Sequence, residues 1–137
     1  LQTFTLPVDA GSIAGYAALK GETVNVPNVY TLPEAAPYRF NFTYDSLTCY
    51  KTTSLIALPL KTNSGSIIGV LQLINARDPQ GHTIPFDHGI EPYLDYFALH
   101  AANAIERAIL KSSPLPKLDD PALFQRTLEI KYKPFEE

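Results

Sequence analysis

Between residues 54 and 76 the chain reads SLIALPL, KTNSG and SIIGVLQLINA in succession. Segments 54–60 and 66–76 are apolar runs of strand length, and the polar turn between them ends at Gly65, which can adopt a positive φ. Two such runs around a short turn predict a β-hairpin. Both strands are apolar on both faces, so neither side of the sheet is expected to face water. Pro59 cannot donate to a strand ladder and is predicted to lie at an unpaired position.

One face of this hairpin is expected to lie under a long amphipathic helix. Apolar residues recur at three- and four-residue spacing, which is the stripe of a helix packed on one side. The stripe consists of Ile90, Tyr93, Leu94, Phe97, Ala98, Ala101, Ile105, Ala108 and Ile109. Pro92 is compatible with this helix only near its start.

The other face is expected to be covered by the irregular segment 25–50. This segment is rich in aromatic residues and prolines and shows no period of two or of 3.6. A long irregular stretch in a compact domain often covers a binding pocket. Upstream, residues 1–8 favour a strand, and residues 12–19 predict a short helix that is capped by Ser12 and ended by Gly21.

The predicted fold class is therefore α+β, with an antiparallel β-sheet covered by helices on one face and by an irregular, partly helical segment on the other. We assign this domain to residues 1–111. Residues 112–137 begin with a proline-rich break and are predicted to be a linker with a short C-terminal helix. That helix would be capped at Asp120, carry Pro121 in its first turn and run towards Ile130.

Composition restricts the classes of function. The 137 residues are 45% hydrophobic, which suits one globular domain, and the formal net charge of −3 gives no basic surface for nucleic acid. No apolar run reaches the roughly 20 residues that cross a bilayer. The single cysteine, Cys49, fits a reducing compartment, so we expect a cytoplasmic location without nucleic-acid or membrane binding.

Four stretches, in this order and at this spacing, resemble the GAF family of sensory domains over roughly residues 6–110. They are residues 12–16 with 20–22; 24–28 with Tyr30; 38–40 through Asp45 to 48–52; and 69–75 (GVLQLIN). By this resemblance the usual first helix and opening strands fall before Leu1, so the chain is expected to begin partway through the fold.

The resemblance implies a non-catalytic sensory or regulatory domain that binds a small molecule. The run 73–78 with Gly81 and residues 85–86 looks most like GAF domains that precede bacterial HD-type phosphohydrolases. Any catalysis would then lie in a neighbouring domain, for example a metal-dependent phosphohydrolase. No cofactor is expected in this chain.

A cyclic nucleotide is among the ligands that the family binds, but part of the signature of those members is missing. Asn75, Phe86 and Asp87 remain, whereas Ala76 and His88 stand where a lysine and a glutamate are usual. This difference speaks against cyclic AMP or cyclic GMP, although a cyclic nucleotide stays among the candidates.

The candidate ligand-binding residues are polar and aromatic side chains in the irregular segment and on the elements around it. They are Ser12, Asn25, Tyr38, Arg39, Phe40, Asp45, Thr48, Cys49, Thr53 and Gln72. Arg39 either anchors a carboxylate or phosphate, or forms a salt bridge with Asp45. Gln72 interrupts an apolar strand, and its amide must be satisfied either by a main-chain group or by a ligand.

Catalytic and metal-binding roles are not expected. Cys49 has the alternatives of nucleophile, redox switch and bilin attachment point, but a small side chain in a pocket wall is the simpler interpretation. His82, His88 and His100 lie in or beside a loop or on a helix without a carboxylate at ligand spacing. We therefore interpret them as surface or helix-face histidines and expect no metal site.

The long helix also offers a second face of small residues, Ala98, Ala101, Ala102 and Ala104. Small side chains allow another helix to approach closely, which favours a homodimer through this helix. The alternative is that these alanines pack under the sheet. A degenerate GAF domain that serves only as a structural dimerisation module is the second functional hypothesis, and an enzyme acting through Cys49 is the third.

Overall fold

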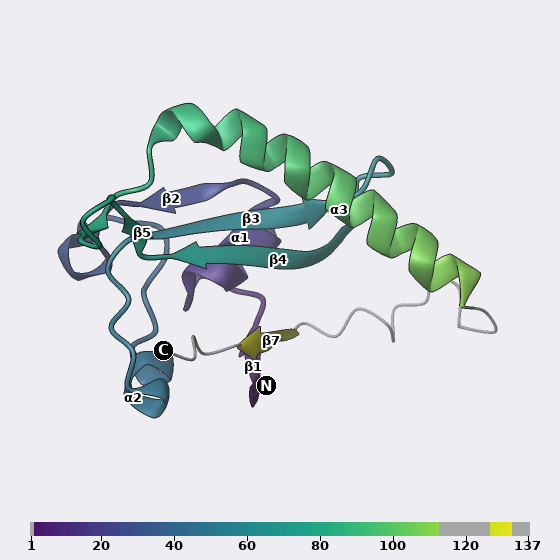
Figure 1. Cartoon of the computed structure of the whole chain (residues 1–137). Coiled ribbons are helices and arrows are strands. Elements are labelled where there is room, and N and C mark those ends of the chain that lie inside the picture. The colour runs from purple at the N-terminus through teal and green to yellow at the C-terminus, as the bar shows by residue number, and fades with distance from the viewer. Residues whose placement is uncertain (1, 113–126, 133–137) are drawn as a thin grey trace.

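The structure, a computed structural model, describes residues 2–112 and 127–132. Its centre is a three-stranded antiparallel sheet built around the predicted hairpin (Figure 1). In chain order the elements are β1 (Gln2–Pro7), α1 (Ile13–Lys20), β2 (Val24–Val26), the 3₁₀ helix η1 (Val29–Thr31), α2 (Thr43–Thr48), β3 (Leu55–Lys61), β4 (Ile67–Ile74), β5 (Ala76–Arg77), β6 (Thr83–Ile84), the 3₁₀ helix η2 (His88–Ile90), α3 (Glu91–Lys111) and β7 (Thr127–Tyr132).

The predicted hairpin is confirmed. Strands β3 and β4 pair antiparallel from Leu55 opposite Ile74, and Gly65 in the turn has a φ of 88°. Strand β4 ends two residues before the predicted boundary because Asn75 adopts a left-handed φ of 55°. That conformation interrupts a strand, and asparagine tolerates it better than most other residues.

A third strand, β2, pairs antiparallel with the first half of β3 and was not predicted. Because β2 begins at Val24, opposite Ala57, its pairing does not extend further along β3, and β3 has a neighbour on one side only at Pro59. The proline therefore lies beyond the three-stranded part of the sheet, although it is not unpaired as predicted, because it lies opposite Val70 of β4. Within the described part of the chain, β4 has no second neighbour, and all of its residues are half-buried.

Alternate residues of β3 point to opposite faces of the sheet, and both faces are covered. Ile56 and Leu58 are fully buried with Ala98 of α3 on one face. Leu55 and Ala57 pack on the other face with Ile13 of α1, and with Tyr38 and Phe40 among the half-buried side chains of the irregular segment. Figure 1 shows α3 and α1 on opposite faces of the sheet. Helix α1 thus shares its face with the irregular segment.

The predicted helix ends are confirmed by their capping geometry. Ser12 is the N-cap of α1, where its hydroxyl accepts a hydrogen bond from the Gly15 N–H at 2.9 Å. Gly21 ends the same helix with a left-handed φ of 68°. Pro92 lies in the first turn of α3, where it removes no helical hydrogen bond.

The short C-terminal helix is corrected where the structure describes this region. Residues 127–132 form strand β7, which pairs antiparallel with β1 from Gln2 opposite Tyr132 to Pro7 opposite Thr127. The segment reads TLEIKY, and its alternation of apolar and polar residues has the period of a strand. The predicted helix start at Asp120 and Pro121 lies outside the described residues.

Candidate functional site

A hollow lined mostly by apolar side chains lies between the start of α1, the irregular segment and the ends of β3 and β4. Its cavity volume is about 120 Å³. The residues that line it are Leu6, Ser12, Ile13, Ala14, Phe40, Asn41, Tyr44, Asp45, Thr48, Tyr50, Thr52, Leu55, Gln72 and Ile74. Residues 40–52, which contain α2, form one wall, and we call them the lid.

Helix α1 can approach the hollow closely because it carries a glycine where the preceding segment crosses it. A Cβ atom on Gly15 would lie 2.6 Å from the carbonyl oxygen of Asp9 and 2.7 Å from that of Pro7. Real contacts of this kind are essentially never that short, so only glycine fits here. The close crossing places Leu6 and Ser12 together at the hollow.

One carboxylate holds the two halves of the lid together. Asp45 on α2 accepts hydrogen bonds from both the backbone N–H of Thr52 at 2.7 Å and its hydroxyl at 2.8 Å. Thr48 donates to the carbonyl of Tyr44 at 2.7 Å, and Tyr44 donates to the carbonyl of Thr5 at 3.2 Å. Burial raises the pKa of Tyr44 above its ordinary value. Both carboxylate oxygens of Asp45 are thus engaged within the protein.

Gln72 is the polar group that the sheet contributes to the hollow. It lies on β4 opposite Ala57, and its half-buried side chain is part of the lining. Its amide forms no hydrogen bond with any residue that the structure describes. Of the two alternatives from the sequence, satisfaction by a main-chain group does not occur within this part of the chain. The amide therefore offers an unused donor and an unused acceptor to the hollow.

Arg39 and its neighbours in sequence are placed differently from expectation. The guanidinium of Arg39 donates to the carbonyls of Ala36 at 2.6 Å, Tyr38 at 3.0 Å and Glu34 at 3.3 Å. Among the described residues it forms no ion pair with Asp45, so the predicted salt bridge is wrong. Arg39 instead fixes the path of its own loop, because carbonyls of an irregular segment have no strand or helix partner.

The aromatic residues beside Arg39 divide between the core and the hollow. Tyr38 packs on Tyr16 of α1 with ring centroids 5.1 Å apart, and it does not line the hollow. Burial, followed by the neighbouring Tyr16, raises the pKa of Tyr38. Phe40 lines the hollow and meets Phe42 edge to face at 4.7 Å. Of the ten candidate residues, the structure brings Ser12, Phe40, Asp45, Thr48 and Gln72 to the hollow.

Cys49 lies outside the hollow and is exposed. It ends α2 with a left-handed φ of 52° and lines a separate shallow groove with Tyr30 and Lys51, among others. The ammonium of Lys51 lies 5.1 Å from the centroid of the Tyr30 ring. The expectation that Cys49 is part of the pocket wall is therefore wrong. Its neighbour Thr48 turns towards the hollow instead.

Asn75, a remnant of the cyclic-nucleotide signature, holds the end of the lid against β4. Its side-chain oxygen accepts from the N–H of Thr53 at 2.7 Å. Its amide nitrogen donates to the carbonyl of Lys51 at 2.7 Å and to the hydroxyl of Tyr50 at 3.1 Å. Thr53, a candidate ligand-binding residue, is therefore part of this connection through its backbone and does not line the hollow.

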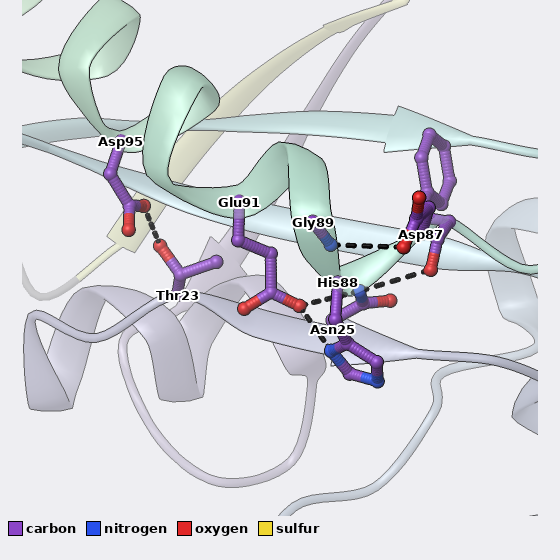
Figure 2. Close-up of polar contacts among 8 residues, drawn as sticks. Thr23, Asn25, Asp87, His88, Gly89, Glu91 and Asp95 are labelled. Carbon is purple, nitrogen blue, oxygen red and sulfur yellow. Dashed lines mark hydrogen bonds and ion pairs between the residues drawn. The ribbon is translucent and has the colours of Figure 1, made fainter.

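Asn25 belongs to a second polar cluster, which joins β2 to the start of α3 (Figure 2). Its amide nitrogen donates to Glu91 at 2.7 Å and to the carbonyl of Phe86 at 3.3 Å, while its own oxygen is buried without a partner among the described residues. His88 contacts the same oxygen of Glu91 at 2.5 Å, and Thr23 donates to Asp95. The cluster lies away from the hollow, so Asn25 is placed as a connection between elements.

The three histidines are held by separate neighbours. His88 contacts Glu91, His82 lies 3.0 Å from Asp78, and the ring of His100 lies 4.2 Å from that of Tyr96. No group of three metal-ligating side chains occurs in the part of the chain that the structure describes.

Two of the four alanines on the small-residue face of α3 are used by the core, while Ala101 is half-buried and Ala104 is exposed. Ala98 and Ala102 are 3% and 0% exposed, so these two alanines pack under the sheet. The exposed side of the helix carries aromatic residues instead, with Tyr93 78%, Tyr96 67% and Phe97 57% exposed. A partner that contacts α3 would therefore meet these rings.

Sequence reasoning missed several lining residues, among them Tyr44, Tyr50 and Thr52. A four-residue spacing puts Tyr44 and Thr48 on one side of α2, but a helix of six residues is too short to show a period.

No described helix is long and apolar enough to span a membrane.

Comparisons with known proteins agree with this architecture. The chain is 37% identical over 92 residues to dual 3′,5′-cyclic-AMP and -GMP phosphodiesterase 11 of Drosophila melanogaster, covering 67% of this chain and 6% of that protein. It is 38% identical over 94 residues to phosphodiesterase 11A of Takifugu rubripes, covering 67% of this chain and 10% of that protein. The chain thus spans a tenth or less of these relatives.

The fold is similar to the crystal structure of residues 122 to 287 of a methyl-accepting chemotaxis protein. The TM-score is 0.59 at 21% identity, covering 79% of this chain and 62% of that one, which supports the fold alone. Residues 2–105 match the family described as the GAF domain. This match covers most of the chain, and the chain therefore belongs to the GAF domain family.

Proposed function

We propose that this domain is a non-catalytic sensor, which binds a small molecule in the hollow beneath the lid and passes the binding event to a neighbouring effector. The family assignment supports a regulatory domain. Among the described residues, both oxygens of Asp45 are bonded to Thr52 and Cys49 lies outside the hollow, which supports a non-catalytic role. Acid–base or nucleophilic chemistry needs such groups free to reach a substrate.

The observation that carries this proposal is the hollow itself, to which β4 contributes a Gln72 amide that bonds to none of the residues the structure describes. This half-buried amide lines a hollow of about 120 Å³ that also exposes aromatic and apolar side chains. A small ligand in the hollow would be within reach of its donor and its acceptor. Pockets of this composition, mostly apolar with a few polar groups, are typical of small-molecule sites.

The lid is linked to the long helix in two steps, first to β4 and then from the sheet to α3. Asn75 joins Tyr50, Lys51 and Thr53 to the end of β4, so a ligand that orders the lid also restrains this end of the strand. Helix α3 packs on the opposite face of β3 and β4. A ligand that binds one lid position better than another shifts the equilibrium by that difference in affinity, and α3 would carry the change onward.

We propose that the effector hydrolyses a phosphodiester. The sequence resemblance implies an HD-type phosphohydrolase, and the two named relatives are cyclic-nucleotide phosphodiesterases. Phosphodiester hydrolysis is the reaction class that these indications share. Both relatives are animal proteins, so they add no support to the bacterial source implied by the resemblance. A cytoplasmic location stays a prediction.

Thermal unfolding with a panel of cyclic nucleotides, amino acids and small carboxylic acids tests the sensor proposal. A ligand that binds only the native state stabilises it by about 2.7 kcal/mol at a hundred times its Kd. Thr48→Trp should abolish this stabilisation by filling the hollow from the lid. Thr43→Trp, on the same short helix but outside the hollow, is the matched control.

A second function, a structural dimerisation module, is favoured by one observation, the exposed aromatic side of α3. Exposed apolar patches of this kind commonly mark interaction sites. Sedimentation equilibrium should then show a concentration-dependent dimer that is lost in a Tyr93→Ser, Phe97→Ser double variant. A dimer together with no stabilisation by any member of the panel would replace the sensor proposal by this one.

A further inference from the structure

We propose that the first two turns of α3, residues 91–97, form a releasable segment that one carboxylate, Glu91, fastens to β2. Release frees this segment from the sheet while the centre of the helix stays packed. We call the contacts of Glu91 with Asn25 and His88 the latch (Figure 2). The inference concerns the start of α3 and not the hollow, so it is independent of whether a ligand binds there.

The segment buries little apolar surface. Of residues 91–97, only Glu91 and Leu94 are half-buried, and the other five are exposed. The first fully buried residue of α3 is Ala98, and Ala102 follows one turn later. Most helical stability in proteins comes from packing of an apolar face, and regions with few buried apolar contacts open more readily than the core. Polar contacts therefore have a large share in holding this segment on the sheet.

The latch is built on a single oxygen atom. Oε1 of Glu91 accepts a hydrogen bond from the amide nitrogen of Asn25 at 2.7 Å and lies 2.5 Å from Nδ1 of His88. Because Asn25 lies on β2 and His88 on η2, this carboxylate joins two elements to the first residue of α3. One turn later, Thr23 donates to Asp95 in an exposed contact. The bond between Asn25 and Glu91 is part-buried, so water screens it less than the second contact.

The closed latch leaves one polar atom unsatisfied. The amide nitrogen of Asn25 donates to Glu91 and to the carbonyl of Phe86, while Oδ1 of Asn25 is buried without a partner among the described residues. Exchanging the nitrogen and oxygen of this amide would place the oxygen against two other acceptors, so the orientation is fixed. An unsatisfied buried acceptor carries a desolvation penalty, which exposure to water removes. Release of the latch therefore costs less than the loss of its hydrogen bonds alone.

Strand β2 connects the latch with the opposite face of the sheet. Side chains of a strand alternate between its faces. Val24 and Val26 pack in the core on the α1 side, whereas Asn25 between them reaches α3. Val26 pairs with Leu55, which lines the hollow. A displacement of β2 is thereby passed to α3 through Glu91, by a route separate from the lid.

Amide hydrogen exchange of the whole chain, resolved by residue with NMR spectroscopy, tests the proposal. In the helix, the N–H groups of residues 95–98 bond to the carbonyls of residues 91–94 and report on the segment, while residues 101–104 report on the centre of α3. Glu91→Leu should raise exchange at residues 95–98 at least about tenfold and change residues 101–104 by less than about twofold. Glu106→Leu, the same substitution at another half-buried glutamate of α3, should change neither group by more than about twofold.

A double variant separates a latch from the general preference of a helix start for an acidic residue. Asn25→Leu combined with Glu91→Leu replaces both partners by apolar side chains of similar size and removes the unsatisfied oxygen. Replacing both partners of a buried hydrogen bond in this way can be neutral or stabilising, whereas removing one partner is destabilising. Exchange at residues 95–98 should therefore return to the rate of the original chain or fall below it. If only the charge at the helix start mattered, the double variant would exchange as fast as Glu91→Leu.

Each outcome supports or overturns the latch. An equal rise over residues 95–104 in Glu91→Leu means that α3 opens as one unit, which overturns the proposal. No rise in Glu91→Leu, or a double variant that exchanges as fast as Glu91→Leu, overturns it as well. Circular dichroism and the midpoint of urea unfolding show whether each variant is folded. If a variant does not fold, the original chain decides, because residues 95–98 should exchange faster than residues 101–104, and the opposite order contradicts a releasable segment.

Discussion

Replacing Asn75 by alanine should destabilise the domain strongly, although the side chain is only half-buried and does not line the hollow. Asn75 connects the lid to β4 through three side-chain hydrogen bonds, to Thr53, Lys51 and Tyr50. It also occupies a left-handed conformation with a φ of 55°. Alanine loses all three bonds and is strained in that conformation.

The magnitude follows from these two effects. A hydrogen bond contributes about 0.5–1.5 kcal/mol net, and since one of the three is solvent-exposed we take about 2–3 kcal/mol for the set. A left-handed backbone costs a residue with a Cβ about 1–2 kcal/mol, which asparagine partly avoids. Asn75→Ala should therefore lose about 3–4 kcal/mol of unfolding free energy. Domains of this kind have about 5–15 kcal/mol in total.

Urea unfolding followed by circular dichroism measures the change, and a second variant separates its two parts. Asn75→Gly loses the same hydrogen bonds but accepts the left-handed φ, so it should be about 1 kcal/mol more stable than Asn75→Ala. The m-value should stay constant if both variants unfold in two states. A loss below 1 kcal/mol for Asn75→Ala, or a glycine variant less stable than the alanine variant, would refute the assignment of Asn75 as the connection between lid and sheet.

Three further predictions address the core and the helices. In an ordinary helix, Gly15→Ala would raise the unfolding free energy by about 1 kcal/mol. Here it should lower the unfolding free energy measured in urea by more than that, because the new Cβ meets two carbonyl oxygens at 2.6 and 2.7 Å. Ala102→Leu should cost about 1–3 kcal/mol by overpacking, whereas Ala104→Leu on the exposed side of α3 should change stability by less than about 0.5 kcal/mol. The raised pKa of Tyr38, caused by burial and by Tyr16, favours the neutral phenol in the fold. The contribution of Tyr38 to stability is therefore present below about pH 10 and declines as the pH rises through its folded-state pKa. Tyr38→Phe lacks this titrating group. Its unfolding free energy should therefore fall less than that of the original chain between about pH 9 and pH 11.

The regular elements with their own sequence signals could be predicted. Segments 54–60 and 66–76 are apolar on both faces and are separated by a glycine-ended turn, which leaves few alternatives to a hairpin covered on both sides. Ser12 and Gly21 mark the two ends of α1 by capping chemistry, and apolar spacing from Ile90 to Ile109 marks α3 as a helix. The predicted face of α3 was partly wrong, because Tyr93, Phe97 and Ile105 of that stripe are exposed and do not pack on the sheet. In each case the signal lies within the element itself.

The elements that were missed depend on contacts distant in sequence. Strand β2 has three residues and exists because β3 offers it a free edge, while α2 has six residues and no stripe of its own. At the C-terminus, the Asp120-Pro121 pair favoured a helix, yet TLEIKY pairs with β1 as a strand. Because β1 offers a partner strand, the alternating pattern of residues 127–132 determined the structure there, and the helix signal of the Asp120-Pro121 pair did not extend to it.

The candidate site shows the same limit at the level of single side chains. Thr48 and Thr52 line the hollow, while their neighbours Cys49 and Thr53 do not. In an irregular segment no fixed period relates one side chain to the next, so the direction of each depends on the backbone path. The left-handed turn at Cys49 is an example, because it directs that side chain out of the hollow and into the exposed groove.

Polar side chains in the irregular segment and on the strands differ in how free they are to bind a ligand. Backbone groups in an irregular segment lack ladder partners, so its polar side chains are used to satisfy them. Asn28 accepts from the N–H of Tyr30, Arg39 donates to loop carbonyls, and Asp45 accepts from the N–H of Thr52. A polar side chain on a regular strand has less of this obligation, because the backbone of the strand is paired with its neighbour; β4 is paired in this way with β3. Gln72 is in that position on β4, and it is the candidate whose hydrogen-bonding groups remain available for a ligand.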